Sequence, residues 1–254
     1  MEHNFIPGIY NYCDRWCEHC SFTSRCRSYE RTSELTQEQT NIGNDAFWEN
    51  MSAGFEQAVT LIREAAKEQG IDLDAAMEEM DHSAYEQKQA GIKDSIKNHP
   101  LTTLGDQYMK TTQPFISEKD LLKETTDQLL QQVGLNLLTE KEVIQSVKDI
   151  GDCFDVITWY LFFINSKLHR ALSGKLEDED DETEYDFPKD YNGSAKIAHI
   201  AIERSMGAWM KLYTLVPSFE DTALNALSLL SKMKNLVIET FPQAMAFKRP
   251  GFDD

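Results

Sequence analysis

The sequence contains few of the residues that interrupt helices. Of its 254 residues, only 12 are glycine and 7 are proline. Hairpin turns depend on glycine, and strands need alternating apolar and polar residues, a pattern that no stretch of this chain follows convincingly. The composition therefore argues against an all-β protein and for a helical one.

Signals for secretion and for membrane insertion are also missing. The opening MEHNFIPG has no basic segment followed by an apolar one, as a secretory signal would. The longest apolar run, residues 156–164, is about half as long as a membrane-spanning helix. We expect a soluble, cytoplasmic protein without membrane contact. In that compartment, closely spaced cysteines serve as metal ligands or redox thiols more often than as structural disulfides.

Positive charge is scarce, because 25 Lys and Arg face 43 Asp and Glu, for a net charge of −18. Such a chain repels nucleic acid and anionic membranes. Within residues 1–33, however, four arginines balance four acidic residues, so the excess lies on the rest of the chain. This distribution predicts two parts, a cysteine-rich segment at 1–33 and an acidic helical body at 34–254.

Apolar residues recur at helical spacing from residue 44 onward. We expect helices at about 44–70, 74–98, 101–113, 117–138, 139–173, 194–217 and 218–241. The helix at 139–173 is apolar on nearly all sides in its middle and should lie at the centre of a bundle. Residues 174–193 carry nine acidic residues against two lysines and should form a solvated acidic loop. The predicted fold class is an all-α helical bundle with an N-terminal cysteine-rich metal-binding cap.

Four of the five cysteines lie within 14 residues. Cys13, Cys17, Cys20 and Cys26 have the spacing C-x3-C-x2-C-x5-C. Thiolates this close repel one another unless a cation or a covalent bond holds them. Neighbouring arginines would lower the pKa values of the thiols and offset the negative charge of a cluster. The pattern therefore predicts a metal or redox site at these four residues.

Three occupants fit this pattern. A [4Fe–4S] cluster takes four thiolates, commonly with three of them close together on one loop. A structural Zn2+ also accepts four cysteines, but usually as two C-x2-C pairs, and only Cys17 and Cys20 form such a pair. Thiol–disulfide exchange at that pair is the third alternative, although no βαβ pattern flanks it. The compact spacing favours the [4Fe–4S] cluster, with Zn2+ as the alternative.

Two cysteine spacings resemble those of iron–sulfur enzymes. The triplet Cys13, Cys17 and Cys20 resembles the C-x3-C-x2-C motif of radical S-adenosylmethionine enzymes, which place it after a strand of a βα barrel. This chain has no strand pattern from which such a barrel could form. The triplet Cys17, Cys20 and Cys26 resembles the first three ligands of auxiliary-cluster domains in the same superfamily, but Glu30 stands where a further cysteine is expected.

Other segments extend a resemblance over more of the chain. They are YNYCDRWC at 10–17, GSAK at 193–196, IERS at 202–205 and RPGFD at 249–253. Together they resemble a family of bacterial all-helical proteins with an N-terminal CDRWC-type four-cysteine motif and no established activity. The resemblance implies that these segments belong to one coherent helical protein, and it adds no reaction.

Helical bundles can also hold di-metal carboxylate sites, which need two Glu-x-x-His motifs and two further glutamates. Glu79 and His82 form one such motif, and the sequence has no second one. His199 and Glu203 lie four residues apart, on one face of an otherwise apolar helix. A di-metal site would have to combine these four residues.

A second candidate site comprises Asp155, His199, Glu203 and Arg204. Asp155 and Arg204 occur where the apolar pattern predicts burial, so we expect them to form an interhelical ion pair. A purely structural role for these polar residues is the simpler interpretation. Cys153, outside the N-terminal cluster, should be a small core residue.

We therefore expect a metal-binding helical protein that uses a [4Fe–4S] cluster for electron transfer or redox sensing, with an unidentified redox or protein partner. One alternative is a structural zinc module on a helical interaction or scaffold protein. Another is a di-metal helical-bundle oxidase. The arginines of residues 1–33 could contact nucleic acid locally, but the charge of the body opposes it. The sequence does not establish whether the chain is an enzyme.

Overall fold

The computed structural model describes residues 4–79, 82–118, 120–179 and 189–253. In these ranges the chain is all-α, without a strand, as the sequence predicts. It divides into two compact units. Met1–Tyr10 and Cys17–Gly91 form one, here called the N-terminal unit, and Asn11–Trp16 and Ile92–Asp254 form the other, here called the bundle unit.

Short helical turns precede the longer helices of the N-terminal unit. Its first residues are tied to a later turn, because the Ile6 N–H donates to the Arg25 carbonyl at 3.0 Å and the Arg25 Nε donates to the Asn4 carbonyl at 3.3 Å. The elements in this part of the chain are η1 (Ile9–Asn11), η2 (Cys17–His19), η3 (Thr23–Arg25), α1 (Arg27–Ser33), α2 (Gln37–Thr40), α3 (Asp45–Glu68) and α4 (Leu73–Glu79).

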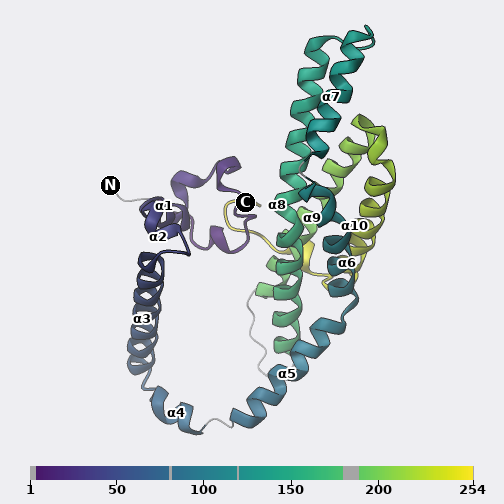
Figure 1. The fold of residues 1–254 in the computed structure, drawn as a ribbon. Coiled ribbons are helices and arrows are strands. Elements are labelled where there is room, and N and C mark those ends of the chain that lie inside the picture. The colour runs from purple at the N-terminus through teal and green to yellow at the C-terminus, as the bar shows by residue number, and fades with distance from the viewer. Residues whose placement is uncertain (1–3, 80–81, 119, 180–188, 254) are drawn as a thin grey trace. The chain divides into compact units, whose positions relative to one another are not determined.

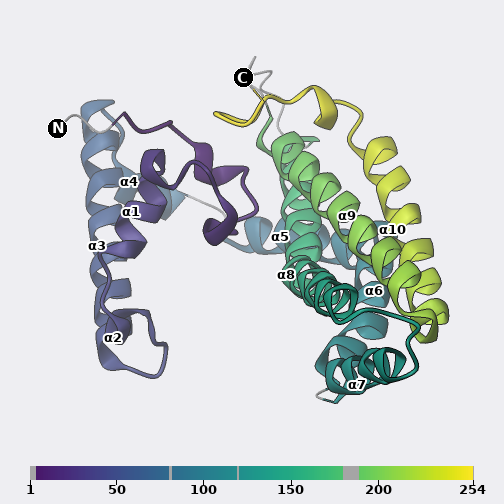
Figure 2. The same cartoon turned by 90° about the horizontal axis from the view of Figure 1, so that it is seen from above.

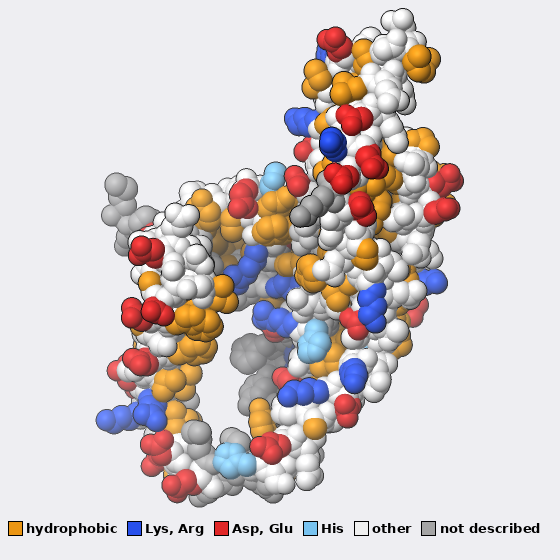
Figure 3. All heavy atoms as spheres, in the orientation of Figure 1, with side chains coloured by type: hydrophobic (Ala, Val, Ile, Leu, Met, Phe, Trp, Pro, Cys, Tyr) orange, Lys and Arg blue, Asp and Glu red, His pale blue; other side chains and the backbone are white. Residues whose placement is uncertain are grey.

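The helix expected at 44–70 is confirmed as α3. It ends before Gly70, whose φ of 73° is a left-handed conformation that favours glycine. Figure 3 shows hydrophobic side chains gathered along this helix. The most exposed of the large hydrophobic residues in this helix, Phe55 and Ile62, are 66% and 60% exposed, and within α3 only Ala66 is buried. The periodicity thus predicted the helix, but it did not identify anything that covers the apolar face.

Four helices of the bundle unit pack in a closed ring (Figures 1 and 2). In order around the ring they are α6 (Pro100–Ser117), α8 (Glu140–Glu179), α9 (Asp190–Leu215) and α10 (Glu220–Thr240). Arg170 meets Asp190 at one end of the α8–α9 pair and Lys211 meets Asp149 at the other, so these two helices are antiparallel. The expectation that the 139–173 helix is central is met, because α8 packs on α6, α7 and α9.

The remaining elements flank this ring. α7 (Leu121–Gly134) packs on α8. α5 (His82–Asn98) precedes α6, and its Ile92 and Ile96 join the apolar core. Two short turns, η4 (Pro217–Phe219) and η5 (Ala244–Ala246), stand before and after α10. No described helix combines the length and the apolarity needed to cross a membrane.

α8 begins at the capping box that the sequence predicts. The Thr139 hydroxyl accepts from the Glu142 N–H at 3.3 Å, and the Glu142 carboxylate accepts from the Thr139 N–H at 2.8 Å. The helix extends to Glu179 instead of ending near residue 173. Part of the expected acidic loop at 174–193 is therefore helical, and residues 180–188 lie outside the described ranges.

The next helix also begins earlier than expected. α9 starts at Asp190, with Lys189 as its N-cap residue, so Ser194 lies inside the helix rather than capping it. Two ion pairs lie in these extensions of an acidic stretch. Asp190 pairs with Arg170 at 2.9 Å, and Lys189 pairs with Asp178 at 2.6 Å.

Pro114 lies inside α6, whereas the sequence predicted that it would follow the helix. A proline removes one backbone donor and crowds the preceding turn. The next residue, Phe115, packs on Phe154 and Phe219, with ring centroids at 5.6 and 4.9 Å. Burial of this aromatic residue favours one further helical turn despite the proline.

The core of the bundle unit contains a buried hydrogen bond between two aromatic residues. The Trp209 Nε1 donates to the Tyr108 hydroxyl at 3.0 Å, and both side chains are fully buried. Cys153 is buried as expected. Burial raises the pKa of Tyr108 to about 12, because the phenolate would lose its hydration in this core.

The raised pKa of Tyr108 leads to a prediction for alkaline pH. A tyrosine that titrates near pH 10 when unfolded and near pH 12 when folded contributes stability below pH 10, and this contribution falls as the pH rises through 12. We expect unfolding free energy measured in urea to fall by roughly 2 kcal/mol per such tyrosine between pH 9 and 12. In Tyr108→Phe this fall should be smaller by that amount. An unchanged pH dependence would contradict the assignment.

Both chain ends of the bundle unit pack over Gly193 of α9. Tyr12 and Phe247 meet edge to face, with ring centroids 4.7 Å apart. A Cβ at Gly193 would lie 2.4 Å from the nearest Tyr12 ring carbon and 2.8 Å from the nearest Phe247 ring carbon. Only glycine allows both rings to approach the helix this closely.

We therefore expect Gly193→Ala to displace both rings and to destabilise the bundle unit by about 1–3 kcal/mol. Gly207→Ala is the matched control, because Gly207 lies in the same helix and a Cβ there meets no atom within 4 Å. That control should be neutral or stabilising by up to about 1 kcal/mol, since alanine favours helix. Equal effects of the two substitutions in urea unfolding would contradict this packing.

Candidate functional site

The segment before the second cysteine is attached to the bundle by one carboxylate. This segment, residues 11–16, is here called the anchor segment. Its Asp14 accepts a hydrogen bond from the Tyr160 hydroxyl at 2.7 Å and forms an ion pair with Arg204. Arg204 also donates to the Tyr160 hydroxyl. The three groups, from the anchor segment, α8 and α9, therefore each contact the other two.

The electrostatics of this cluster favour a neutral Tyr160 hydroxyl. Tyr160 is 1% exposed, and burial raises its pKa to about 12. The hydroxyl therefore remains protonated at neutral pH and can donate to Asp14, while Arg204 supplies the positive charge that a half-buried carboxylate needs.

Backbone and ring contacts hold the same segment. The Trp159 Nε1 donates to the Asp14 carbonyl at 3.0 Å, and the Trp16 N–H donates to the Asp14 carboxylate at 3.2 Å. The ring of Trp16 stacks on Trp159 with centroids 5.2 Å apart. Arg15, which lies between Asp14 and Trp16 in the chain, has φ 58°, a left-handed conformation that is unfavourable for arginine. Contacts on both sides thus keep the chain in a turn that it would not adopt alone.

Cys13 lies in this anchored stretch. Before it, the Tyr12 hydroxyl donates to Asp190 at 2.9 Å, and the Lys167 Nζ lies 3.5 Å from the Asn11 carbonyl. The bundle unit therefore holds the chain on both sides of the first predicted ligand, and the Cys13 side chain is half-buried.

The other three predicted ligands belong to the N-terminal unit. Cys17 and Cys20 lie on one short turn, with the Cys20 N–H donating to the Cys17 carbonyl at 3.1 Å. The Phe22 N–H points to the Cys20 sulfur at 3.4 Å. Cys26 precedes α1 as its N-cap residue. All four are half-buried thiols rather than disulfides.

Among the residues that the structure describes, no three His, Cys, Asp or Glu side chains meet as ligands of one metal ion. The metal-binding role of the four cysteines therefore stays a prediction.

The residues of the predicted second site do not all contact one another, and some of them pair with residues outside the site. Asp155 is exposed, so the expectation of its burial is wrong, and Arg204, also exposed, pairs with Asp14 instead. Glu203 binds the Lys234 ammonium at 2.7 Å, which lowers the pKa of the carboxyl. His199 lies 3.7 Å from Glu203, and burial lowers its pKa, so the imidazole is neutral at pH 7. The Glu203–Lys234 contact supports a structural role, and a ligand site at these residues stays a prediction.

One of the four residues of the di-metal alternative, Glu79, has a side chain that lies outside those described. Glu79 ends α4, and His82 begins α5. In the bundle unit, the Lys234 contact occupies one oxygen of Glu203, which a metal would have to displace.

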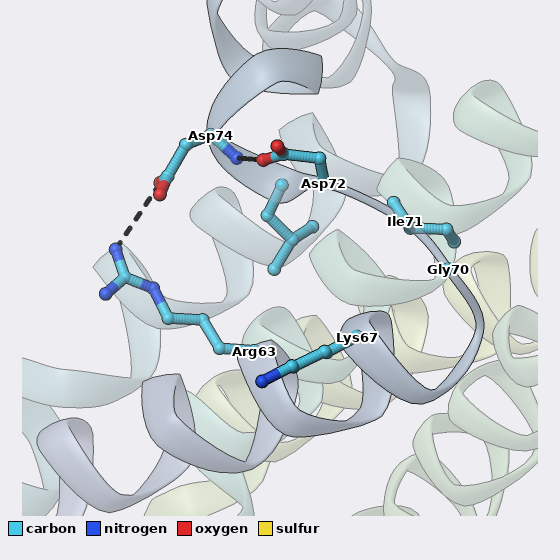
Figure 4. A pocket seen from close by; sticks show the side chains of 7 residues that line it. Arg63, Lys67, Gly70, Ile71, Asp72 and Asp74 are labelled. Carbon is cyan, nitrogen blue, oxygen red and sulfur yellow. Dashed lines mark hydrogen bonds and ion pairs between the residues drawn. The ribbon is translucent and has the colours of Figure 1, made fainter.

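A groove of about 380 Å3 in the N-terminal unit lies where the chain turns after α3 (Figure 4). Arg63 reaches toward Asp74 at 3.6 Å, and the Asp72 carboxylate accepts from the Asp74 N–H at 3.1 Å. Both members of the ion pair are mostly exposed. These contacts organise the turn itself, and an exposed pair of this kind contributes little to stability or to ligand binding.

Comparisons with protein-family models, with curated proteins and with solved structures gave no match. The anchor segment and the cysteines around it are therefore interpreted from the residues and contacts of this chain.

The sequence pointed to Arg204 as a charge that needs a partner, but it indicated the wrong residue. Asp14 lies 190 positions from Arg204 in the chain, and its sequence context is like that of any other acidic residue in a cysteine-rich segment. The one available signal was that Asp14, Arg15 and Trp16 are the three residues between the first two cysteines.

We expect Asp14→Ala to destabilise the bundle unit by about 2 kcal/mol, because it leaves the Tyr160 hydroxyl and Arg204 without their common acceptor. Near-UV circular dichroism should report the loss of the Trp16–Trp159 stack. Asp155→Ala, which removes an exposed carboxylate from α8, should change stability by no more than about 0.5 kcal/mol. Similar losses in both variants would exclude a special role for Asp14.

Proposed function

We propose that this chain is a metal-binding helical protein in which Cys13, Cys17, Cys20 and Cys26 hold a [4Fe–4S] cluster for electron transfer or redox sensing. The observation that carries the proposal is the spacing of four half-buried thiols within 14 residues of the sequence, the first of them in a segment attached to the bundle unit. An iron–sulfur cluster held by four thiolates would supply one-electron chemistry.

The anchor segment supports the proposal through the first two ligands. The three residues that separate Cys13 from Cys17 are those that bind or stack on α8 and α9. A ligand loop needs a fixed starting point, because each side chain ordered on metal binding costs conformational entropy. The contacts of Asp14 and Trp16 already order the chain between the first two ligands, so less conformational entropy is lost when a metal binds.

The turn that begins at Cys17 supports it through the third ligand, Cys20. The Phe22 N–H at 3.4 Å from the Cys20 sulfur is a donor that stabilises a thiolate. Hydrogen bonds to ligand sulfurs are also among the factors that set the potential of an iron–sulfur cluster. A zinc thiolate would gain from the same donor, so this contact supports metal binding rather than one metal.

The cluster would also have to organise the N-terminal unit. Since no three described side chains meet as metal ligands, residues 17–26 must rearrange when a metal binds. Coupling of this kind between metal binding and local folding is usual for small cysteine sites. Protease resistance of the N-terminal residues should therefore increase with metal content.

Cysteine variants test the proposal. Protein purified without oxygen should be brown and should contain about four irons and four sulfides per chain. We expect Cys20→Ser to lose most of the iron and the visible absorption. Cys153→Ala is the matched control, because Cys153 is buried in the bundle core and should leave the iron content unchanged.

Other outcomes distinguish the alternatives. Colourless protein with one zinc per chain, lost in Cys20→Ser, would replace the cluster with the structural zinc module. Metal that persists in Cys20→Ser but is lost in His199→Ala would favour a site in the helices. Protein that binds neither iron nor zinc would overturn the proposal of a metal site.

A further inference from the structure

A groove between α6 and α8 in the bundle unit combines one acid with apolar and hydroxyl groups. Its volume is about 510 Å3, within the range of small-molecule sites. α6 contributes Thr102, Asp106 and Met109, and α8 contributes Phe162, Asn165, Ser166 and His169. Phe162 is 53% exposed, so its ring is available to a ligand.

Asp106 differs from the other half-buried acids of this unit. Among the described residues these acids are Asp14, Asp106, Asp149, Asp178 and Asp253. Four of them pair with a cation, namely Arg204, Lys211, Lys189 and the pair Arg249 and Lys196. Asp106 has a hydrogen bond from the Asn165 amide at 2.9 Å, but no ion pair with a described cation. A half-buried carboxylate without a counter-ion is stabilised by binding one.

The carboxylate is also held in place. Asn165 donates from Nδ2 to Asp106, and the same nitrogen lies 3.8 Å from the Met109 sulfur. Its Oδ1 lies only 2.6 Å from the position of a Cβ at Gly105, so the amide fits against α6 because residue 105 is glycine. The orientation of Asp106 is thus fixed before a ligand binds, which lowers the entropic cost of binding.

We propose that this groove binds a small organic monocation, a primary alkylammonium. The ammonium binds the Asp106 carboxylate, with hydroxyl oxygens of Thr102 and Ser166 as further acceptors, and the alkyl chain lies against Phe162 and Met109. This site is independent of the cysteines and of any metal that they hold.

The composition of the groove selects this class of ligand. A divalent metal ion normally takes several charged or imidazole ligands, and no three His, Cys, Asp or Glu side chains meet as ligands in the described ranges. An anion would be repelled by Asp106, because no lysine or arginine lines the groove. An aromatic ring and a thioether beside one carboxylate suit a cation with an apolar part.

The test is a titration of the full chain with n-butylammonium chloride, followed by amide NMR. We expect saturable shifts at Asp106, Phe162 and Asn165, with a Kd on the order of 1 mM for so small a ligand. Sodium butyrate, which has a similar chain and the opposite charge, should produce none of these shifts. Equal shifts with both salts, or no saturation below about 50 mM butylammonium, would overturn the proposal.

Two variants locate the binding. Asp106→Asn keeps the acceptor for Asn165 and should weaken binding at least about tenfold through loss of the charge. Phe162→Leu should weaken it a few-fold through loss of the ring face. Asp152→Asn is the control, because it removes one exposed negative charge from α8 outside the groove and should bind like the unmodified protein. Unchanged affinity in a folded Asp106→Asn variant would overturn the proposal.

Discussion

The carboxylate of Asp14 is the group on which the attachment of the anchor segment to the helices depends. It accepts from the Tyr160 hydroxyl and pairs with Arg204, so one side chain joins residues 11–16 to α8 and α9 at once. Its own backbone carbonyl accepts from Trp159, whose ring stacks on Trp16. Isolated surface ion pairs contribute little, but this one is shared with a buried hydroxyl, which strengthens it.

The anchor segment contacts the two helices that pack most extensively on each other. α8 and α9 form the most extensive helix pair, and Asp14 bridges them near the middle of α8. At the start of α9, Tyr12 and Phe247 meet over Gly193, and Lys196 binds both the Phe247 carbonyl and Asp253. These contacts in the bundle unit therefore hold an early segment and the tail on α9. Cys13, the first of the four cysteines, therefore lies in a segment whose position depends on contacts with α8 and α9.

The helices were largely predictable because they depend on local patterns. Apolar spacing identified α3, α8 and α10, and the pair Thr139 and Glu142 marked the start of α8. Predictions failed where distant contacts outweigh local preferences. Pro114 is accommodated because Phe115 packs on Phe154 and Phe219, and past residue 173 the acidic end of α8 gains an ion pair between Asp178 and Lys189. Burial of Asp155 was inferred from its neighbours on the helix, but that face of α8 is open at this position.

The amino-acid sequence by itself determined the all-α class, most helix positions and the grouping of four thiols, since all of these are encoded within a few consecutive turns of chain. Only the tertiary structure decided which charges meet. Asp14 and Arg204 are 190 residues apart, and no periodicity relates them. Likewise, Asp106 is an ordinary helical acid in the sequence, and only the packing of α6 on α8 shows that it lacks a counter-ion among the described residues. Pairing of charges over such separations depends on how helices pack in three dimensions, and local sequence preferences carry no information about it.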